Sequence, residues 1–438
     1  MKSINITTND RQCFQLILFR CLVIGFCTFF TPQLLALNKT QTSIENARSA
    51  GCQSDAPDPG GIRCSSYPGT NDSGEAISPE QSSSVGTNSN KTSSSQTNSA
   101  NQTVMNRMAI LRSGTVTARG SNVQFYNDGK ALEQISYAGL TTNKGAASAD
   151  EYSKLGLWAN GIFRFGNVDS TTQESKGYNF NNLGVTIGLD YAISQDFILG
   201  TAFTYLSTSG GFVENGGDLQ SDLFNGAIYA SYNITDDFYI DALAFYGGNN
   251  YNITRNVNYA ISTGNVNERL EGTPGGRQYG FNLNSGYSFR FQRLEIEPYL
   301  GVSYLGTDID AYNEKSLGTT NSWAAKYDAQ NLASLKTTLG ALLAYNFDVP
   351  WGVLIPQVRG EWHHEFEDHG RAIGAQISGT GENYSIFIEN PDRDYFTFGA
   401  SVASAFDYGI TAFLAYDMLI GYNNVSSYGF TLGGRIDF

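Results

Sequence analysis

Residues 428–438 read YGFTLGGRIDF, and their side chains alternate in character along the stretch. The even-numbered positions hold apolar residues or glycine: Tyr428, Phe430, Leu432, Gly434, Ile436 and Phe438. The odd-numbered positions hold small, polar or charged residues, which include Arg435 and Asp437. Because successive side chains of a β-strand point to opposite faces, the stretch predicts a strand with one oily face and one wetted face. The fold then depends on what covers the oily face.

The composition of the 438 residues favours strands and turns over helices, since charged residues make up 16%, aromatic residues 13%, and 48 residues are glycine. No uninterrupted apolar run of about 20 residues follows the N-terminal region, so the mature chain is not expected to contain a helical membrane span. The net charge of −14 argues against nucleic acid as a partner, because binding to phosphates requires a basic surface.

Residues 1–36 are expected to be a signal peptide that directs the chain to the Sec export machinery. Basic residues precede the apolar stretch 21–30, and the sequence QLLA places Leu34 and Ala36 at the spacing of a signal-peptidase site. Cys52 and Cys64 lie beyond this signal. They could bind a metal, but no histidine lies near them, so a small disulfide loop in an oxidising compartment is the favoured interpretation.

Residues 37–100 are dominated by Ser, Thr, Asn and Gly, as in EQSSSVGTNSNKTSSSQTNSANQ. Large apolar residues are almost absent, and such a segment cannot offset the entropy cost of folding. We therefore expect a disordered arm.

Residues 101–154 are expected to hold one short helix followed by a connector. In QTVMNRMAILRSG, Val104, Met108 and Leu111 recur at helical spacing. Arg107 and Arg112 lie off this apolar stripe, and a glycine follows at a position suited to ending the helix.

Residues 155–438 follow a different rule, a repeated β-hairpin. An apolar strand end, a tight polar turn and a new apolar start occur in YAISQDFI, YNITDDFYI, FRFQRLEI, YNFDVPWGVL and AFDYGITAF. Together with the strand that begins LGLWANGIF and the terminal strand, these five hairpins predict twelve strands. The connections at the other strand ends are longer, at about 166–176, 208–218, 249–276, 306–332 and 367–394, with a short one near Asn424. Short turns at one end and long loops at the other are typical of outer-membrane barrels.

The strands of a soluble β-sandwich also alternate between apolar and polar side chains. The placement of charged residues is therefore needed to distinguish a membrane barrel from a sandwich. Leu183, Val185 and Ile187 lie on one face of their strand, and the following Asp190 lies on the other. A Lys or Arg that faced lipid would cost about 2–4 kcal/mol at the bilayer centre, so a membrane enforces this segregation. The charges predicted to face a watery lumen are Asp190, Glu295, Glu297, Lys336, Arg359, Glu361, Asp417 and Arg435. We therefore predict an all-β, closed antiparallel transmembrane barrel, with the last strand paired to the first so that no backbone edge meets hydrocarbon.

Several stretches, in this order, resemble the β-domain of the autotransporter family, which carries out type V secretion in Gram-negative bacteria. They are LGLWANGIFRFG, NLGVTIGLDYAISQDFILGTAFTYLS, YDAQNLASLKTTLGALLAYNF, PQVRGEWHHEFED and the closing hairpin. The similarity covers about residues 103–438. It implies a monomeric 12-stranded barrel in outer-membrane lipid, with a helix through its lumen that joins a surface-exposed passenger to the first strand. It also implies that Ile436 and Phe438 form the signature read by the barrel assembly machinery.

VMNRMAILRSG resembles the pore helix of this family, which would place Arg107, Met108 and Arg112 in the lumen. Glu361 and Asp417 are then candidate partners for the two arginines, and an amphipathic helix packed outside the barrel is the alternative. Some family members cleave themselves within this helix at two adjacent asparagines. The matching positions here are Gln102 and Thr103, so self-cleavage of that kind is not expected. The 37–100 arm is also a much shorter passenger than is usual in the family.

HHEFEDH, residues 363–369, could suggest a metal site or a protease. Alternation places His363 and His364 on opposite faces, so ordinary residues at the barrel rim are the favoured interpretation. Aromatic residues near strand ends, such as Trp158 and Trp362, are interpreted as interfacial girdles, with ligand stacking as the alternative. No catalytic residue, metal ligand or cofactor is expected.

The predicted function is that of an outer-membrane translocator and anchor that carries its own short N-terminal segment to the cell surface. The alternative is a pore or a surface adhesin that acts through its long extracellular loops.

Overall fold

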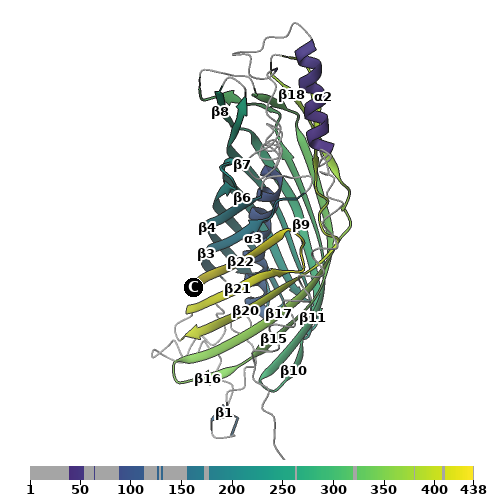
Figure 1. The fold of residues 1–438 in the computed structure, drawn as a ribbon. Helices are drawn as coiled ribbons and strands as arrows, with labels where there is room; N and C mark the ends of the chain where they lie inside the picture. Colours follow the sequence, from purple (N-terminus) through teal and green to yellow (C-terminus); the bar gives the residue numbers. More distant parts are fainter. Residues whose placement is uncertain are drawn as a thin grey trace, which may run out of the picture. The chain divides into compact units, whose positions relative to one another are not determined.

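The computed structural model describes residues 39–53, 64, 88–112, 126–127, 130–131, 155–171, 177–261, 264–318, 323–378, 380–406 and 410–437. Within these residues, 12 antiparallel strands form a closed barrel, as the sequence predicts (Figure 1). The barrel strands are β3 (Leu155–Val168), β4 (Tyr178–Ala192), β5 (Phe197–Phe212), β6 (Gly217–Asn233), β7 (Phe238–Ile261), β9 (Gly275–Tyr287), β11 (Leu294–Ile309), β15 (Gln330–Tyr345), β17 (Gly352–Glu365), β20 (Asp394–Phe406), β21 (Ile410–Ile420) and β22 (Val425–Asp437).

The barrel closes where the last strand meets the first. Strand β22 pairs with β3 from Val425 opposite Val168 to Asp437 opposite Gly156. On the other side of the barrel, β11 pairs with both β9 and β15. Each described barrel strand therefore has two neighbours, which satisfies the backbone hydrogen bonds that hydrocarbon cannot.

The apolar residues of the strands face outward, and the charged residues face inward. The exposed fraction is 58% for both Leu183 and Leu432, but it is 2% for Asp190 and 4% for Arg435. The oily face of the terminal strand is thus the outer surface of the barrel, and its wetted face lines the lumen. This arrangement excludes the β-sandwich, in which the oily face would be buried.

Helix α3 (Ser89–Arg112) lies inside the barrel, where it packs against β3 to β7 and β11 (Figure 1). Its apolar stripe meets the wall as the spacing predicts, with Val104 and Met108 buried beside Trp158. The helix begins twelve residues before position 101, so part of the arm that we expected to be disordered is helical. The entropy argument assumed a segment surrounded by water, but a polar lumen supplies partners for Ser, Thr, Asn and Gln side chains.

Helix α2 (Lys39–Gln53) is the second departure from the predicted disordered arm. It lies at the barrel end where the long loops are, against the short strand β19 (Asn383–Ile388). Ile44 and Ala47 are each only 4% exposed. These few apolar residues suffice because a preformed surface receives them, as described below.

The two ends of the barrel differ as predicted, except that two connections predicted as loops, at 208–218 and 249–276, consist largely of paired strands. The five predicted hairpins form the short-turn end, which includes β10 (Phe289–Phe291) and β16 (Phe347–Val349). At the opposite, long-loop end, the connection predicted at 208–218 is wrong, because β5 and β6 stay paired up to Phe212 opposite Gly217. Only residues 213–216 form the turn, and Gly217 has φ +129° with no room for a Cβ atom beside the Thr254 carbonyl. The Ser- and Gly-rich sequence that suggests a loop is instead an extended hairpin.

The described parts of the long loops form strands and share an apolar core. Strands β8 (Gly264–Gly272) and β13 (Lys315–Ser316) extend the barrel sheet. A separate four-stranded sheet, here called the loop sheet, contains β12 (Tyr312–Asn313), β14 (Ala325–Tyr327), β18 (Arg371–Ile377) and β19.

Outside the barrel and the long loops, between α3 and β3 in the sequence, β1 (Tyr126–Asn127) and β2 (Lys130–Ala131) pair with each other.

A buried ion pair lies inside the loop region. Arg255 donates from Nε to Glu314 at 2.8 Å and from Nη2 to the Trp323 carbonyl at 2.7 Å. Burial raises the pKa of the nearby Tyr327 and Tyr384 phenols, so both stay neutral beside the pair. A buried charge pair of this kind fixes one arrangement of the loops, because separating it leaves uncompensated charges.

Candidate functional site

The charges that the sequence assigns to the lumen lie on the inner face of the barrel wall. Asp190, Glu295, Glu297, Asp417 and Arg435 are all buried. The Arg359 and Glu361 side chains are 14% and 9% exposed. The Lys336 ammonium reaches α3, where it donates to the Asn98 side chain at 3.4 Å. Two clusters that include some of these groups contact the helix.

The first cluster lies near the short-turn end and joins α3 to the wall through one carboxylate. Arg107 donates to Asp190 Oδ2 from Nε at 3.1 Å and from Nη2 at 2.9 Å. Arg435 donates to Oδ1 of the same carboxylate at 3.0 Å. The Tyr229 hydroxyl donates to Asp190 at 3.2 Å and accepts from the Trp158 indole at 2.8 Å. Asp190 therefore compensates one arginine of the helix and one of the terminal strand.

This cluster corrects two sequence-based interpretations. Arg107 is in the lumen, but its partner is Asp190 rather than Glu361 or Asp417. Trp158 is 2% exposed and lies inside the barrel, so it is not part of an interfacial girdle. The strand register decides both, because it brings Asp190 opposite Gly156 and Trp158 opposite Gly188.

The glycines opposite these side chains are functional residues that sequence reasoning missed. A Cβ atom on Gly156 would lie 2.3 Å from the Arg435 guanidinium and 2.6 Å from the Asp190 carboxylate. A Cβ atom on Gly188 would lie 2.2 Å from the Trp158 ring. If the pairing register between β3 and β4 were known, it would show that each glycine lies opposite a large inward side chain.

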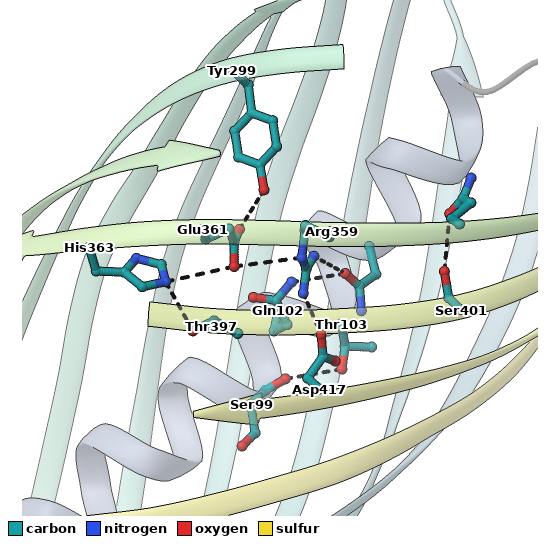
Figure 2. A network of polar contacts seen from close by, with 12 residues as sticks. Ser99, Gln102, Thr103, Tyr299, Arg359, Glu361, His363, Thr397, Ser401 and Asp417 are labelled. Carbon is teal, nitrogen blue, oxygen red and sulfur yellow. Dashed lines mark hydrogen bonds and ion pairs between the residues drawn. The ribbon is translucent and has the colours of Figure 1, made fainter. Parts of the chain in front are cut away.

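The second cluster surrounds Arg359 of β17 (Figure 2). Arg359 donates to the Asn106 side chain of α3 at 2.8 Å and forms an ion pair with Asp417. Its Nε lies 3.6 Å from Glu361, which accepts a hydrogen bond from the Tyr299 hydroxyl at 2.6 Å. The Gln102 amide oxygen, in its hydrogen-bonding orientation, also accepts from Arg359. The wall pairs its own charges here, and the helix adds neutral amides.

The two histidines that begin HHEFEDH lie on opposite faces of β17. His363 faces the lumen between Thr338 and Thr397, whose hydroxyls lie 2.9 and 3.0 Å from its ring nitrogens. His364, on the other face of the strand, lies 2.8 Å from Asp394. Among the described residues, no group of three or more His, Cys, Asp or Glu side chains could hold a metal ion.

A cavity of about 750 Å³ lies beside α3, between the helix and the inner face of the barrel wall. Its lining mixes apolar side chains with charges of both signs, among them Arg164 and Lys336 as well as Glu297 and Asp417. The helix thus fills only part of the lumen. Such a lumen can accommodate a hydrophilic chain without burying unpaired charge.

The remaining predicted residues are placed as follows. Met108 is fully buried against the wall, and Ile436 is 46% exposed on the outer face of β22. Cys52 and Cys64 are joined by a disulfide with a Cα–Cα distance of 5.5 Å. Phe438, the Arg112 side chain and the signal peptide lie outside the described residues. In the part of the chain that is described, no helix is both long and apolar enough to cross a bilayer.

We predict that Asp190→Asn destabilises the barrel strongly, because the buried Arg107 and Arg435 lose the carboxylate charge that they share. Removing one member of a buried pair costs about 3–5 kcal/mol. The matched control is Asp308→Asn, which breaks the exposed Arg277–Asp308 pair and should have little effect. Thermal unfolding of the purified protein in detergent measures both. Equal melting temperatures for the two variants would contradict the assigned role of Asp190.

Comparison with known proteins places this architecture in a family. The family model described as "Autotransporter beta-domain" matches residues 157–417. Among solved structures, the translocator domain of the autotransporter NalP from Neisseria meningitidis matches with a TM-score of 0.51 and 16% identity. That match covers 69% of this chain and 91% of the NalP domain, and it supports the fold alone.

Curated relatives agree over the same region. Outer membrane protein A of Rickettsia conorii is 25% identical over 296 residues, which cover 64% of this chain and 14% of that protein. An extracellular serine protease of Serratia marcescens is 24% identical over 295 residues, which cover 64% of this chain and 26% of that protein. This chain therefore matches only a minor part of each relative's length. Because the family model spans more than half of the chain, this protein belongs to the autotransporter β-domain family and is a β-barrel of the outer membrane.

Proposed function

We propose that this protein is a translocator and anchor that carries its own N-terminal segment through the barrel to the cell surface. The observation that carries the proposal is the path of α3 along the lumen. Near its start, the Ser93 hydroxyl contacts the Tyr251 hydroxyl at the long-loop end. Near its end, Arg107 contacts Asp190, which lies three residues before the turn 193–196 at the short-turn end.

The length of α3 fits a complete crossing of the membrane. Its 24 residues rise about 36 Å, at about 1.5 Å per residue, and the hydrocarbon core of a bilayer is about 30 Å thick. The first and last turns of α3 are thus at opposite ends of the barrel. Since short turns of outer-membrane barrels face the periplasm and long loops face outside, the N-terminal segment is on the outside.

The lumen chemistry suits passage of this particular segment. The Gln96 side chain of α3 bonds to Ser221 and Asn249 of the wall, and all three residues are buried. Neutral side chains of this kind exchange one hydrogen-bond partner for another at small net cost. Ion pairs between residues of the wall, such as Arg359 with Asp417, neutralise each other's charge whichever part of the segment lies beside them.

Family membership also implies how the protein reaches its location. Sec export through a signal in residues 1–36 and insertion by the barrel assembly machinery are the general route of the family. We assign Ile436 and Phe438 to the signature read during insertion. An apolar side chain on the outer face of the terminal strand, as at Ile436, supports this role.

Two epitope tags test the proposed function. A tag inserted between residues 70 and 80 should bind antibody on intact cells, because this segment precedes α3. A tag inserted between residues 135 and 145, after α3, should bind only when the outer membrane is permeabilised. The second tag is the control for membrane integrity. A tag at 70–80 that is silent on intact cells but detected after permeabilisation would contradict export of the segment.

The cavity beside α3 favours a second candidate function, a passive pore for small hydrophilic solutes. A volume of about 750 Å³ remains with the helix in place, and charged side chains of both signs lie in its lining. In this view the translocator keeps a residual passage after export is complete.

We predict that deleting residues 89–112 raises single-channel conductance in planar bilayers several-fold, because the deletion empties the occupied side of the lumen. Deletion of residues 65–87, which precede the helix, is the control and should leave the conductance of the full chain unchanged. If both deletions leave conductance unchanged, α3 does not restrict the lumen, and its assigned position there is wrong.

A further inference from the structure

We propose that the outer edge of strand β19 is a docking site for the exported segment, and that residues 39–53 attach to it as helix α2 once they are outside. The inference rests on the proposed function and adds the destination of the segment. Strand β19 pairs with β18 on one side, from Gln376 opposite Asn383 to Arg371 opposite Ile388. It is the last strand of the loop sheet, and α2 lies where another strand would pair.

Side-chain oxygens of α2 take over the hydrogen bonds that a neighbouring strand would make. The Phe387 backbone N–H donates to Thr40 Oγ1 at 2.9 Å, and the Ser385 N–H donates to Ser43 Oγ at 2.8 Å. Alternate N–H groups of an edge strand point away from its partner, so Ser385 and Phe387 present the outward pair. Unpaired edges of this kind invite association with other chains, and covering them with a helix is one way to prevent it.

One face of α2 is built to match the loop sheet. Thr40, Ile44, Ala47 and Gly51 recur at helical spacing, and all four are buried. Ile44 and Ala47 join the apolar core that contains Ile377, Tyr384 and Ile386 of the loop sheet. The opposite face, with Thr42, Asn46 and Ala50, is exposed.

Gly51 shows how close the two surfaces approach. A Cβ atom on Gly51 would lie 3.1 Å from Cγ2 of Thr380, in the connection between β18 and β19. At the other end of the helix, the Lys39 ammonium lies 5.9 Å from the centre of the Phe387 ring. The contact therefore runs along the whole helix, from its first residue to its last turn.

The helix depends on this contact for its structure. A 15-residue helix is marginal in water even with strong helix formers, and this one is rich in Ser, Thr and Asn and contains a glycine. Its first turn has no acidic residue and its last turn no basic residue to complement the helix dipole. Docking and helix formation are therefore one event, and the loop sheet is the template for it.

The docked helix changes what the cell displays. The segment is not a free arm, because residues 39–53 are fixed to the loops of the same molecule. The disulfide between Cys52 and Cys64 closes a loop directly after the helix and ties the next residues to it. The surface available to the outside is then a composite of the loops and the exposed face of α2.

Tryptic cleavage after Arg48 on intact cells tests the docking, with mass spectrometry of the released peptide as the measurement. Ile44→Asp places a charge in the buried face and should speed cleavage at Arg48 at least ten-fold. Asn46→Asp adds the same charge to the exposed face and should leave the rate unchanged. Equal rates for the two variants would overturn the docking.

Ser385→Pro probes the same contact from the loop sheet. It removes the N–H that donates to Ser43 but keeps the pairing with β18, because this N–H points away from β18. Cleavage after Arg48 should again rise at least ten-fold, and an unchanged rate would count against the docking.

The epitope tag at residues 70–80 distinguishes failure of the docking proposal from failure of the export proposal. A visible tag with Arg48 equally sensitive in all variants refutes docking alone, whereas a tag hidden on intact cells refutes both export and docking.

Discussion

Pairing between β22 and β3 is the interaction on which the rest of the molecule depends. Hydrocarbon offers no partner for backbone N–H and C=O groups, so a sheet in a membrane must close on itself. Thirteen residue pairs make this seam, from Val425 opposite Val168 to Asp437 opposite Gly156. Once the sheet is closed, each strand has one face in lipid and one in the lumen. The separation of Leu432 from Arg435 onto opposite faces of the terminal strand follows directly.

A wide polar lumen in turn explains how a sequence without a core of its own can be ordered. Helix α3 satisfies its own backbone, so the wall needs to match only its side chains. The wall compensates most of its own charges, as Arg359 and Asp417 do, and the helix contributes mainly neutral groups such as Asn106 and Gln96. Arg107 is the exception, since it bonds to Asp190 and holds the end of the helix at one level of the barrel. A lumen that is largely compensated without the helix is compatible with a chain moving through it.

Sequence alone predicts the strands, their faces and the five short hairpins, because alternation and turn chemistry are local properties. Contacts between distant residues account for what it misses. The register across Gly156 brings Arg107 to Asp190, and Gly188 makes room for Trp158 inside the barrel. The Ser- and Gly-rich connection at 208–218 is a paired hairpin rather than a loop. Both helical parts of the predicted arm need a surface made elsewhere in the chain, the lumen wall for residues 89–100 and the edge of β19 for residues 39–53.

The central claim is that the polar faces of the strands enclose α3, and cross-linking of introduced cysteines in outer membranes with a short bismaleimide tests it most directly. In a chain with Cys52→Ala and Cys64→Ala, the reagent should link Gln96→Cys to Asn249→Cys, because the tips of these two side chains are hydrogen-bonded in the lumen and a short spacer replaces their length. The same helix cysteine should not cross-link to Gly248→Cys, whose side chain would point to the opposite face of the strand. A helix that forms no cross-link with position 249, or that cross-links equally with position 248, would contradict the account.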